Sequence, residues 1–193
     1  PIIMVVIVLA LLAYFIVPRI LRKDRKSEYD KKVSKWKYPF HLMAHPINGY
    51  TDLKFEKKGS LLVANIILVL FFLVSIIVRQ ATGYLFNNND LESFNIVFTF
   101  LSSVGIFVFF VVAQWAVSVL MDGEGTFKEI WVFTAYALLP YIIIMIPITL
   151  LSNVLTLDET AFFTMFNIIA YAWTGLGILL GTREAHQFSM IKT

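Results

Sequence analysis

Five apolar runs alternate with short polar segments along the 193 residues of the chain. The runs are Ile2–Val17, Leu61–Val78, Phe94–Met121, Ile130–Leu151 and Ala161–Gly181. A bilayer core of about 30 Å is crossed by about 20 helical residues, so each run except the slightly short first one is long enough. Short loops between long helices are typical of antiparallel neighbours. The pattern therefore predicts an all-α, polytopic transmembrane helical bundle with five apolar helices.

The composition agrees with a membrane protein. The chain is 59% hydrophobic and 15% charged, whereas soluble domains are about 45–50% apolar and about 25% charged. Its mean hydropathy is +0.77, so lipid is needed to cover much of the apolar surface. The chain has no Cys, which excludes disulfides, thiolate metal sites and Cys nucleophiles.

The positive charges are concentrated in one part of the chain. Twelve of the sixteen Lys and Arg residues lie between Arg19 and Lys58. The protein is predicted to lie in the cell (plasma) membrane. Because cytoplasmic loops collect Lys and Arg, residues 19–60 are predicted to be on the cytoplasmic side and the residue 1 side on the extracytoplasmic side. The loops at 122–129 and 182–193 then also lie inside, and the outer loops are acidic. The net charge of +3 is thus a sign of topology and not of nucleic-acid binding.

Charge and hydropathy divide the chain into three parts. Residues 1–21 are expected to form an N-terminal transmembrane anchor helix, residues 22–59 a basic cytoplasmic juxtamembrane and interfacial segment, and residues 60–193 the main bundle. The basic segment fits a solvated helix, and it also fits a helix that is attracted to anionic lipid. That attraction contributes about 1 kcal/mol per cation near the membrane surface, and the two interpretations are compatible. Because the chain starts at Pro1 inside an apolar run, it is expected to be a fragment of a longer polypeptide.

No Asp, Glu, His, Lys or Arg lies within the five apolar runs. Ion-coupled carriers place such residues within the membrane, so a proton-coupled carrier is disfavoured. Neutral polar side chains in the runs could line a path for a neutral solute, but they more often bridge helices through hydrogen bonds. They are Asn95, Ser102, Ser103, Gln114 and Asn167.

His41 and His45 have the i,i+4 spacing of a possible zinc site. The metalloprotease pattern needs Glu after the first His, but Leu42 stands there, and Pro46 interrupts the helix. We therefore expect the two histidines to take part in interfacial packing or hydrogen bonding, and we expect no metal site. The sequence contains no Gly-rich phosphate loop with Lys-Ser/Thr and no serine nucleophile elbow, so no catalytic residue and no cofactor is predicted.

The segment Asp122-Gly123-Glu124-Gly125-Thr126 predicts a tight turn between two helices. Its two carboxylates could meet a cation, although hard cations usually need more ligands. The favoured interpretation is a helix stop and restart, in which Thr126 caps the next helix and Glu129 completes a capping box.

Two further motifs concern the shape and packing of helices. Pro140 and Pro147 fall on one face of one helix, and each removes a backbone donor. They indicate either a kinked packing helix or a broken helix that lines a cavity, as in transporters. Gly177 and Gly181 form a G-x-x-x-G pattern, which favours a close helix contact within the molecule or in a dimer.

Two stretches, 44–60 and 122–141, resemble a known family. The first contains His45, Pro46 and Gly49, and the second contains Asp122, Gly123, Glu124, Lys128, Tyr136 and Pro140. In combination, and over roughly residues 38–193, they resemble the bacterial branch of the Yip domain family, the Ypt/Rab-interacting proteins and their prokaryotic relatives. The resemblance implies a domain of five membrane helices with a cytoplasmic N-terminal part. In eukaryotes such proteins act in Golgi–ER traffic and contact Rab-type GTPases. Ile2–Val17 is then an additional helix, and the fifth helix of the domain is expected beyond Thr193.

The leading hypothesis is a non-enzymatic multi-pass membrane protein that acts as a scaffold or partner-recruiting subunit of a membrane complex, for example beside an ABC-type sugar transporter. Its expected partners are the lipid bilayer, anionic lipid at the basic segment and other membrane protein subunits. The alternative is a transporter or lipid-moving protein that uses the Pro-kinked helix at 130–151.

Overall fold

The computed structural model describes residue 34 and residues 36–87, 94–121, 123–189 and 193. The predicted anchor helix at 1–21 and the basic segment up to residue 33 lie outside the described residues. Within the described part the secondary structure is helical, and it has no strands. Four helical spans of 21 to 30 residues are long and apolar enough to cross a membrane, so the four apolar helices predicted after residue 60 are confirmed.

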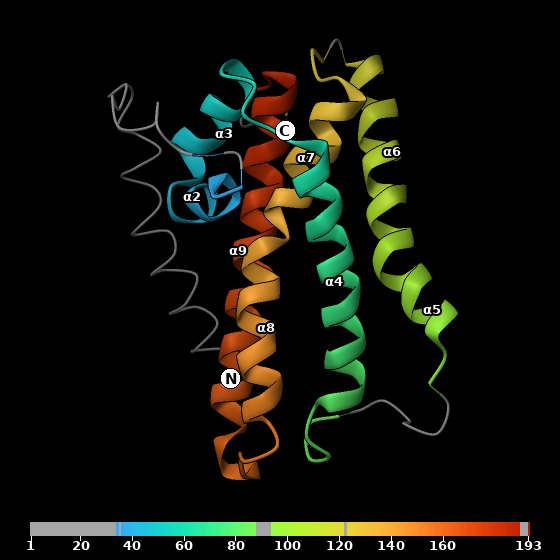
Figure 1. Ribbon diagram of the computed structural model, residues 1–193, viewed down its shortest axis with the longest axis vertical. Helices are drawn as coiled ribbons and strands as arrows, with labels where there is room; N and C mark the ends of the chain where they lie inside the picture. Colours follow the sequence, from blue (N-terminus) through green and yellow to red (C-terminus); the bar gives the residue numbers. More distant parts are fainter. Residues whose placement is uncertain (1–33, 35, 88–93, 122, 190–192) are drawn as a thin grey trace.

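The four spans run up and down beside one another (Figure 1). The first is α4 (Leu61–Ala81), and the second joins α5 (Ile96–Phe100), a π-helical turn (Leu101–Gly105) and α6 (Ile106–Leu120). The third consists of α7 (Phe127–Ala137) and α8 (Leu139–Leu151). The fourth is a 3-10 turn (Leu157–Glu159) followed by α9 (Thr160–His186).

The third span differs from the single helix that the apolar run at 130–151 predicts. Leu138 separates α7 from α8, and Pro140 lies in the first turn of α8. At that position a missing N–H costs little, because the first helical N–H groups have no partner within the helix. Pro140 therefore starts a helix instead of bending one. Pro147 lies inside α8, where its ring removes one backbone hydrogen bond.

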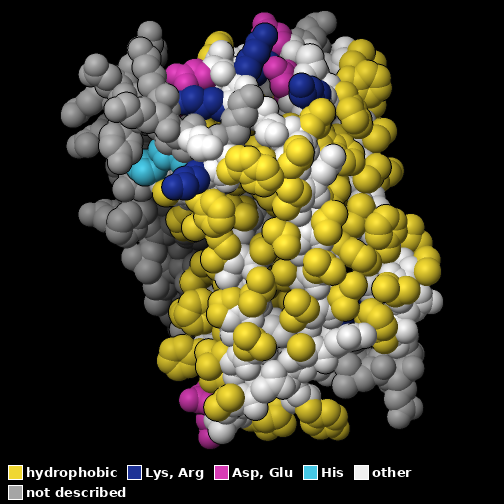
Figure 2. Space-filling model, viewed as in Figure 1, with side chains coloured by type: hydrophobic (Ala, Val, Ile, Leu, Met, Phe, Trp, Pro, Cys, Tyr) yellow, Lys and Arg dark blue, Asp and Glu magenta, His cyan; other side chains and the backbone are white. Residues whose placement is uncertain are grey.

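The broken span forms the centre of the bundle. Its most apolar stretch is 61% buried, against 22–28% for the other three spans. It contacts α4 on one side and α9 on the other, so most of its side chains meet protein rather than lipid. The face of the bundle shown in Figure 2 is covered mainly by hydrophobic side chains, while charged side chains gather toward the two ends.

Two short helices precede the bundle and pack on its side near one end. They are α2 (Tyr38–Ala44) and α3 (Pro46–Phe55), with His45 between them and Pro46 in the first turn of α3. The predicted helix break at Pro46 is therefore confirmed. Contacts of α3 with α9 hold the pair against the bundle (Figure 1).

At the opposite end, the turn after α4 is joined to the end of α8. Gly83 N donates a hydrogen bond of 2.8 Å to Ser152 Oγ, and Asn153 Nδ2 donates one of 2.8 Å to the carbonyl oxygen of Ala81. Ser152 is buried. These bonds satisfy polar groups at the ends of two helices and fix the distance between them.

The second span starts with a strong cap. Asn95 Oδ1 accepts hydrogen bonds from the backbone N–H groups of Val97 and Phe98, which is the usual function of an N-cap Asn. Arg79 from the end of α4 donates a 3.0 Å bond to Ser102 Oγ and lies over the ring of Phe98. Ser102 therefore helps to bridge two helices, whereas Asn95 and Ser103 form hydrogen bonds within their own span.

Candidate functional site

The end of the bundle where Lys and Arg gather in Figure 2, called the charged end below, brings together α3, the start of α7 and the end of α9 (Figure 1). Lys54 Nζ donates a hydrogen bond of 2.6 Å to the carbonyl oxygen of Ala185 and lies 3.6 Å from Glu129 Oε2. Its side chain is only 12% exposed. The cation thus faces a carboxylate and also a carbonyl near the C-terminal end of α9, where helices favour positive charge. One lysine therefore joins three helices.

The turn before α7 contains a capping box, which confirms the cap interpretation of this segment. Thr126 N donates to Glu129 Oε2 at 3.0 Å, and Glu129 N donates to Thr126 Oγ1 at 3.3 Å. The Glu129 carboxylate is therefore engaged by the helix start and by a lysine. Glu124 and Lys128 are exposed. Asp122 lies outside the described residues.

The imidazole of His186 fills the space beside the two glycines of this turn. A Cβ added to Gly125 would lie 2.5 Å from His186 Nδ1, and one added to Gly123 would lie 3.0 Å from the same atom. His186 is only 2% exposed, and its ring stacks on Phe188. None of the described glycines has a positive φ. Glycine is therefore needed at these two positions because a histidine ring approaches closely, and not because of an unusual backbone conformation.

Gly177 and Gly181 on α9 let two other helices approach closely. A Cβ on Gly181 would lie 3.1 Å from Tyr50 Cε1, and one on Gly177 would lie 3.2 Å from Ala137 Cβ. Tyr50 is buried and its hydroxyl donates to the carbonyl oxygen of Phe133 at 3.4 Å. Burial raises the pKa of the Tyr50 phenol far above its ordinary value, so the group stays a neutral donor. The G-x-x-x-G pattern thus serves a contact within this molecule.

Two other tyrosines position α2 and the start of α4. Tyr38 donates a 2.8 Å hydrogen bond to the carbonyl oxygen of Gly49, and Tyr136 Oη accepts a 3.1 Å bond from Ser60 N. A Cβ on Gly49 would lie 2.7 Å from Leu42 Cδ1, so α2 and α3 are in tight contact there. The motif residues at 45–49 and at 136 therefore belong to one packed structure at the charged end.

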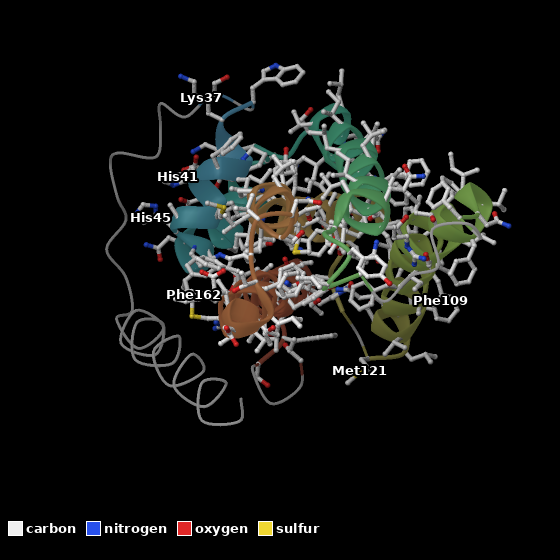
Figure 3. The ribbon with its side chains drawn as sticks, turned by 90° about the horizontal axis from the view of Figure 1, so that it is seen from below. Lys37, His41, His45, Phe109, Met121 and Phe162 are labelled. Carbon is white, nitrogen blue, oxygen red and sulfur yellow. The ribbon has the colours of Figure 1, made fainter. Side chains whose placement is uncertain are left out.

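The outer side of α2 carries polar side chains. Lys37, His41 and His45 follow one another at i,i+4 spacing and are directed away from the bundle (Figure 3). The two imidazole rings stack with their centroids 5.0 Å apart. Among the residues that the structure describes, no three His, Asp or Glu side chains are placed to hold a metal ion.

A groove of about 410 Å³ lies between α6 and α9, near the charged end. Gln114 Nε2 donates a 2.8 Å hydrogen bond to Thr182 Oγ1 and lies 3.5 Å from His186 Nε2. Gln114 Oε1 and His186 Nδ1 are buried without a hydrogen-bond partner. The sequence left Gln114 with two interpretations, a solute path or a hydrogen bond between helices, and did not connect it with His186. The feature of the sequence that could have pointed to His186 is its position just after the last apolar run.

These features define a multi-pass helical membrane protein in which two short helices pack against one end of the bundle. A family comparison matches the Yip1 domain to residues 40–193. The chain therefore belongs to the Yip1 domain family, and the resemblance inferred from its two motif stretches is confirmed at the level of the family. No curated protein and no solved structure matches the chain.

Proposed function

We propose that this Yip1-family protein is a non-enzymatic membrane subunit that recruits partner proteins at the charged end of its bundle. The observation that carries the proposal is the surface of the α2–α3 pair. Tyr38 and Tyr50 of this pair are buried, whereas Phe40 and Phe55 are 57% and 67% exposed. Large exposed aromatic side chains close to charged ones are typical of an interaction surface.

The α2–α3 pair is also held rigidly enough to bind without a large ordering cost. Lys54 and Tyr50 fix α3 to α7 and α9, and Tyr38 fixes α2 to α3. A surface that is already ordered loses less conformational entropy when a partner binds. This arrangement supports a docking surface that is built into the fold.

The charged end is proposed to face the cytoplasm. The segment before α4, the turn before α7 and the end of α9 all lie at this end, and the turn after α4 and the turn before α9 lie at the other (Figure 1). Lys54, Lys57, Lys58, Lys128 and Arg183 belong to the first group, and Arg79, Asp158 and Glu159 to the second. The excess of Lys and Arg supports the cytoplasmic assignment.

Cysteine labelling tests this orientation directly, because the chain has no natural Cys. Lys57→Cys and Asp158→Cys place single thiols at exposed positions of the two ends. In intact cells a membrane-impermeant maleimide is expected to label Asp158→Cys only, and after permeabilisation it is expected to label both. Labelling of Lys57→Cys in intact cells would contradict the proposed sidedness.

Site-specific photo-crosslinking tests recruitment. A photoreactive amino acid at position 55 is expected to give one discrete protein adduct in gently solubilised membranes. Phe40→Ser should reduce that adduct at least about fivefold, because it removes the other largely exposed aromatic side chain of the α2–α3 pair. The control places the photoreactive group at Val154, which is 79% exposed at the opposite end. Purification as a lone monomer, with no more adduct at 55 than at 154, would refute the proposal.

Transport through the broken span is the competing function. The break at Leu138 supports it, because interrupted helices line the substrate sites of many transporters. The residues around the break are buried between α4 and α9, however, from Val132 to Ile142 without interruption. This packing favours a structural function for the break over a path for solute.

A further inference from the structure

The groove between α6 and α9 changes in polarity along its length. Both helices run toward the charged end, so higher residue numbers lie closer to it (Figure 1). The part near the charged end mixes polar groups with apolar side chains: Gln114, Ser118, Thr182 and His186 are polar, and Val117, Met121 and Phe188 are apolar. The described residues that line the deeper part, such as Phe110 and Gly175, are all apolar. The wall from Gly175 to His186 extends about 16 Å at 1.5 Å per residue. A ligand that fits this groove is therefore polar at one end and apolar along the rest.

The polar part of the groove contains an unused hydrogen-bond acceptor. Gln114 Oε1 is buried and has no partner, while the amide nitrogen is occupied by Thr182. The Thr182 hydroxyl donates to the carbonyl oxygen of Ile178 and cannot also donate to Gln114. His186 Nε2 lies 3.5 Å from the Gln114 amide nitrogen, whereas its Nδ1 is directed at the turn of Gly123 and Gly125 and takes no part in this site. Buried polar groups are almost always paired, so a ligand with an N–H or O–H donor would complete this site.

The groove is open along its side. Gly175 is exposed, and a Cβ placed on it would meet no heavy atom within 4 Å. In a membrane protein such a lateral opening at this depth faces the bilayer. The volume of about 410 Å³ falls within the range of small-ligand sites, about 300–1,000 Å³.

We infer that this groove binds one membrane lipid, with its headgroup region at Gln114 and an acyl chain along α6 and α9 toward Phe110 and Gly175. Among the described residues that line the groove there is no Asp, Glu, Lys or Arg, so these residues recognise a headgroup by hydrogen bonding and not by net charge. The site selects headgroups that carry an amine or hydroxyl donor. Phosphatidylcholine, whose quaternary ammonium has no N–H, is disfavoured. This binding is independent of partner recruitment at the α2–α3 surface.

Native mass spectrometry of the full chain in detergent tests the site. The probes are phosphatidylethanolamine, phosphatidylglycerol and phosphatidylcholine with identical acyl chains. We expect phosphatidylethanolamine or phosphatidylglycerol to bind about tenfold more tightly than phosphatidylcholine. A preference for phosphatidylethanolamine indicates an amine donor, and a preference for phosphatidylglycerol indicates a hydroxyl donor. Gln114→Leu should abolish this preference, since it removes the acceptor at nearly constant volume. Gly175→Leu should abolish binding of all three, since it fills the deep part of the groove.

Two variants serve as matched controls. Asn167→Leu removes an amide from α9 outside the groove, where the side chain bonds Phe163 of its own helix, and Gly175→Ala adds a methyl group that leaves the groove open. Both should bind lipid as the unchanged protein does. Equal affinity for the three lipids would overturn the inference. Lipid binding by Gly175→Leu that equals the binding of the unchanged protein would also overturn it. The same holds if Gly175→Leu still binds lipid but loses a protein partner or a second copy of the chain. If Gln114→Leu fails to fold, the lipid binding of Gly175→Leu alone tests the inference.

Discussion

Gly83→Ala is expected to destabilise the protein by at least about 3 kcal/mol, which is at the upper end for a single substitution. An added Cβ would collide with the backbone of the turn after α8: it would lie 2.7 Å from the carbonyl carbon of Ser152 and 3.1 Å from Cα of Asn153. Backbone atoms cannot rotate away as a flexible side chain can. The collision therefore separates α4 from α8 and breaks the hydrogen bond from Gly83 N to Ser152 Oγ.

Thermal unfolding in detergent measures this effect, and Gly175→Ala is the matched control. Both variants replace a glycine by alanine, but a Cβ at position 175 meets nothing. In the interior of α9, alanine should instead stabilise the helix by about 0.5–1 kcal/mol. Gly83→Ala is expected to lower the unfolding temperature, and Gly175→Ala is expected to raise it. If Gly83→Ala melted like the unchanged protein, the close contact between the two turns would be wrong.

The sequence predicted the four spans of the bundle because long apolar runs have few alternatives in a membrane. It placed their ends less accurately. The apolar run ends at Gly181, but α9 continues to His186 because Arg183 and Glu184 are compatible with helix. Pro140 shows a second limit. A proline within an apolar run fits both a bent helix and the first turn of a new one, and only packing distinguishes them.

The candidate site was harder to predict because its contacts join distant parts of the chain. Lys54 and Ala185 are separated by 131 residues along the chain, and no pattern in the sequence pairs them. The capping box at Thr126 was predictable because both of its partners lie within one turn. The contact between Gly125 and His186 was not, because a glycine in a turn is usually explained by its backbone conformation alone.

Tyr50→Ala is expected to destabilise the protein by about 3–5 kcal/mol, the range for removing a buried aromatic ring. Tyr50 is 1% exposed and packs against Phe133 and the glycines of α9. Its loss leaves a cavity between α3 and α9, and α9 has no side chains at Gly177 and Gly181 to fill it. Detachment of α3 from the bundle should then expose residues 56–60 to proteases.

Tyr50→Phe is the matched control, because it keeps the ring and removes only the 3.4 Å hydrogen bond to Phe133. It should cost about 1 kcal/mol or less, since a long, weak bond contributes little. Gly181→Leu tests the same contact from the other side, where a Cβ would already lie 3.1 Å from Tyr50. Unfolding and limited proteolysis are measured for all three variants, together with crosslinking from position 55. Equal losses in Tyr50→Phe and Tyr50→Ala would assign the stability to the hydroxyl and contradict the packing argument.

Because recruitment is proposed to need α3 held against α9, Tyr50→Ala and Gly181→Leu should also lose the crosslinked adduct, while Tyr50→Phe keeps it.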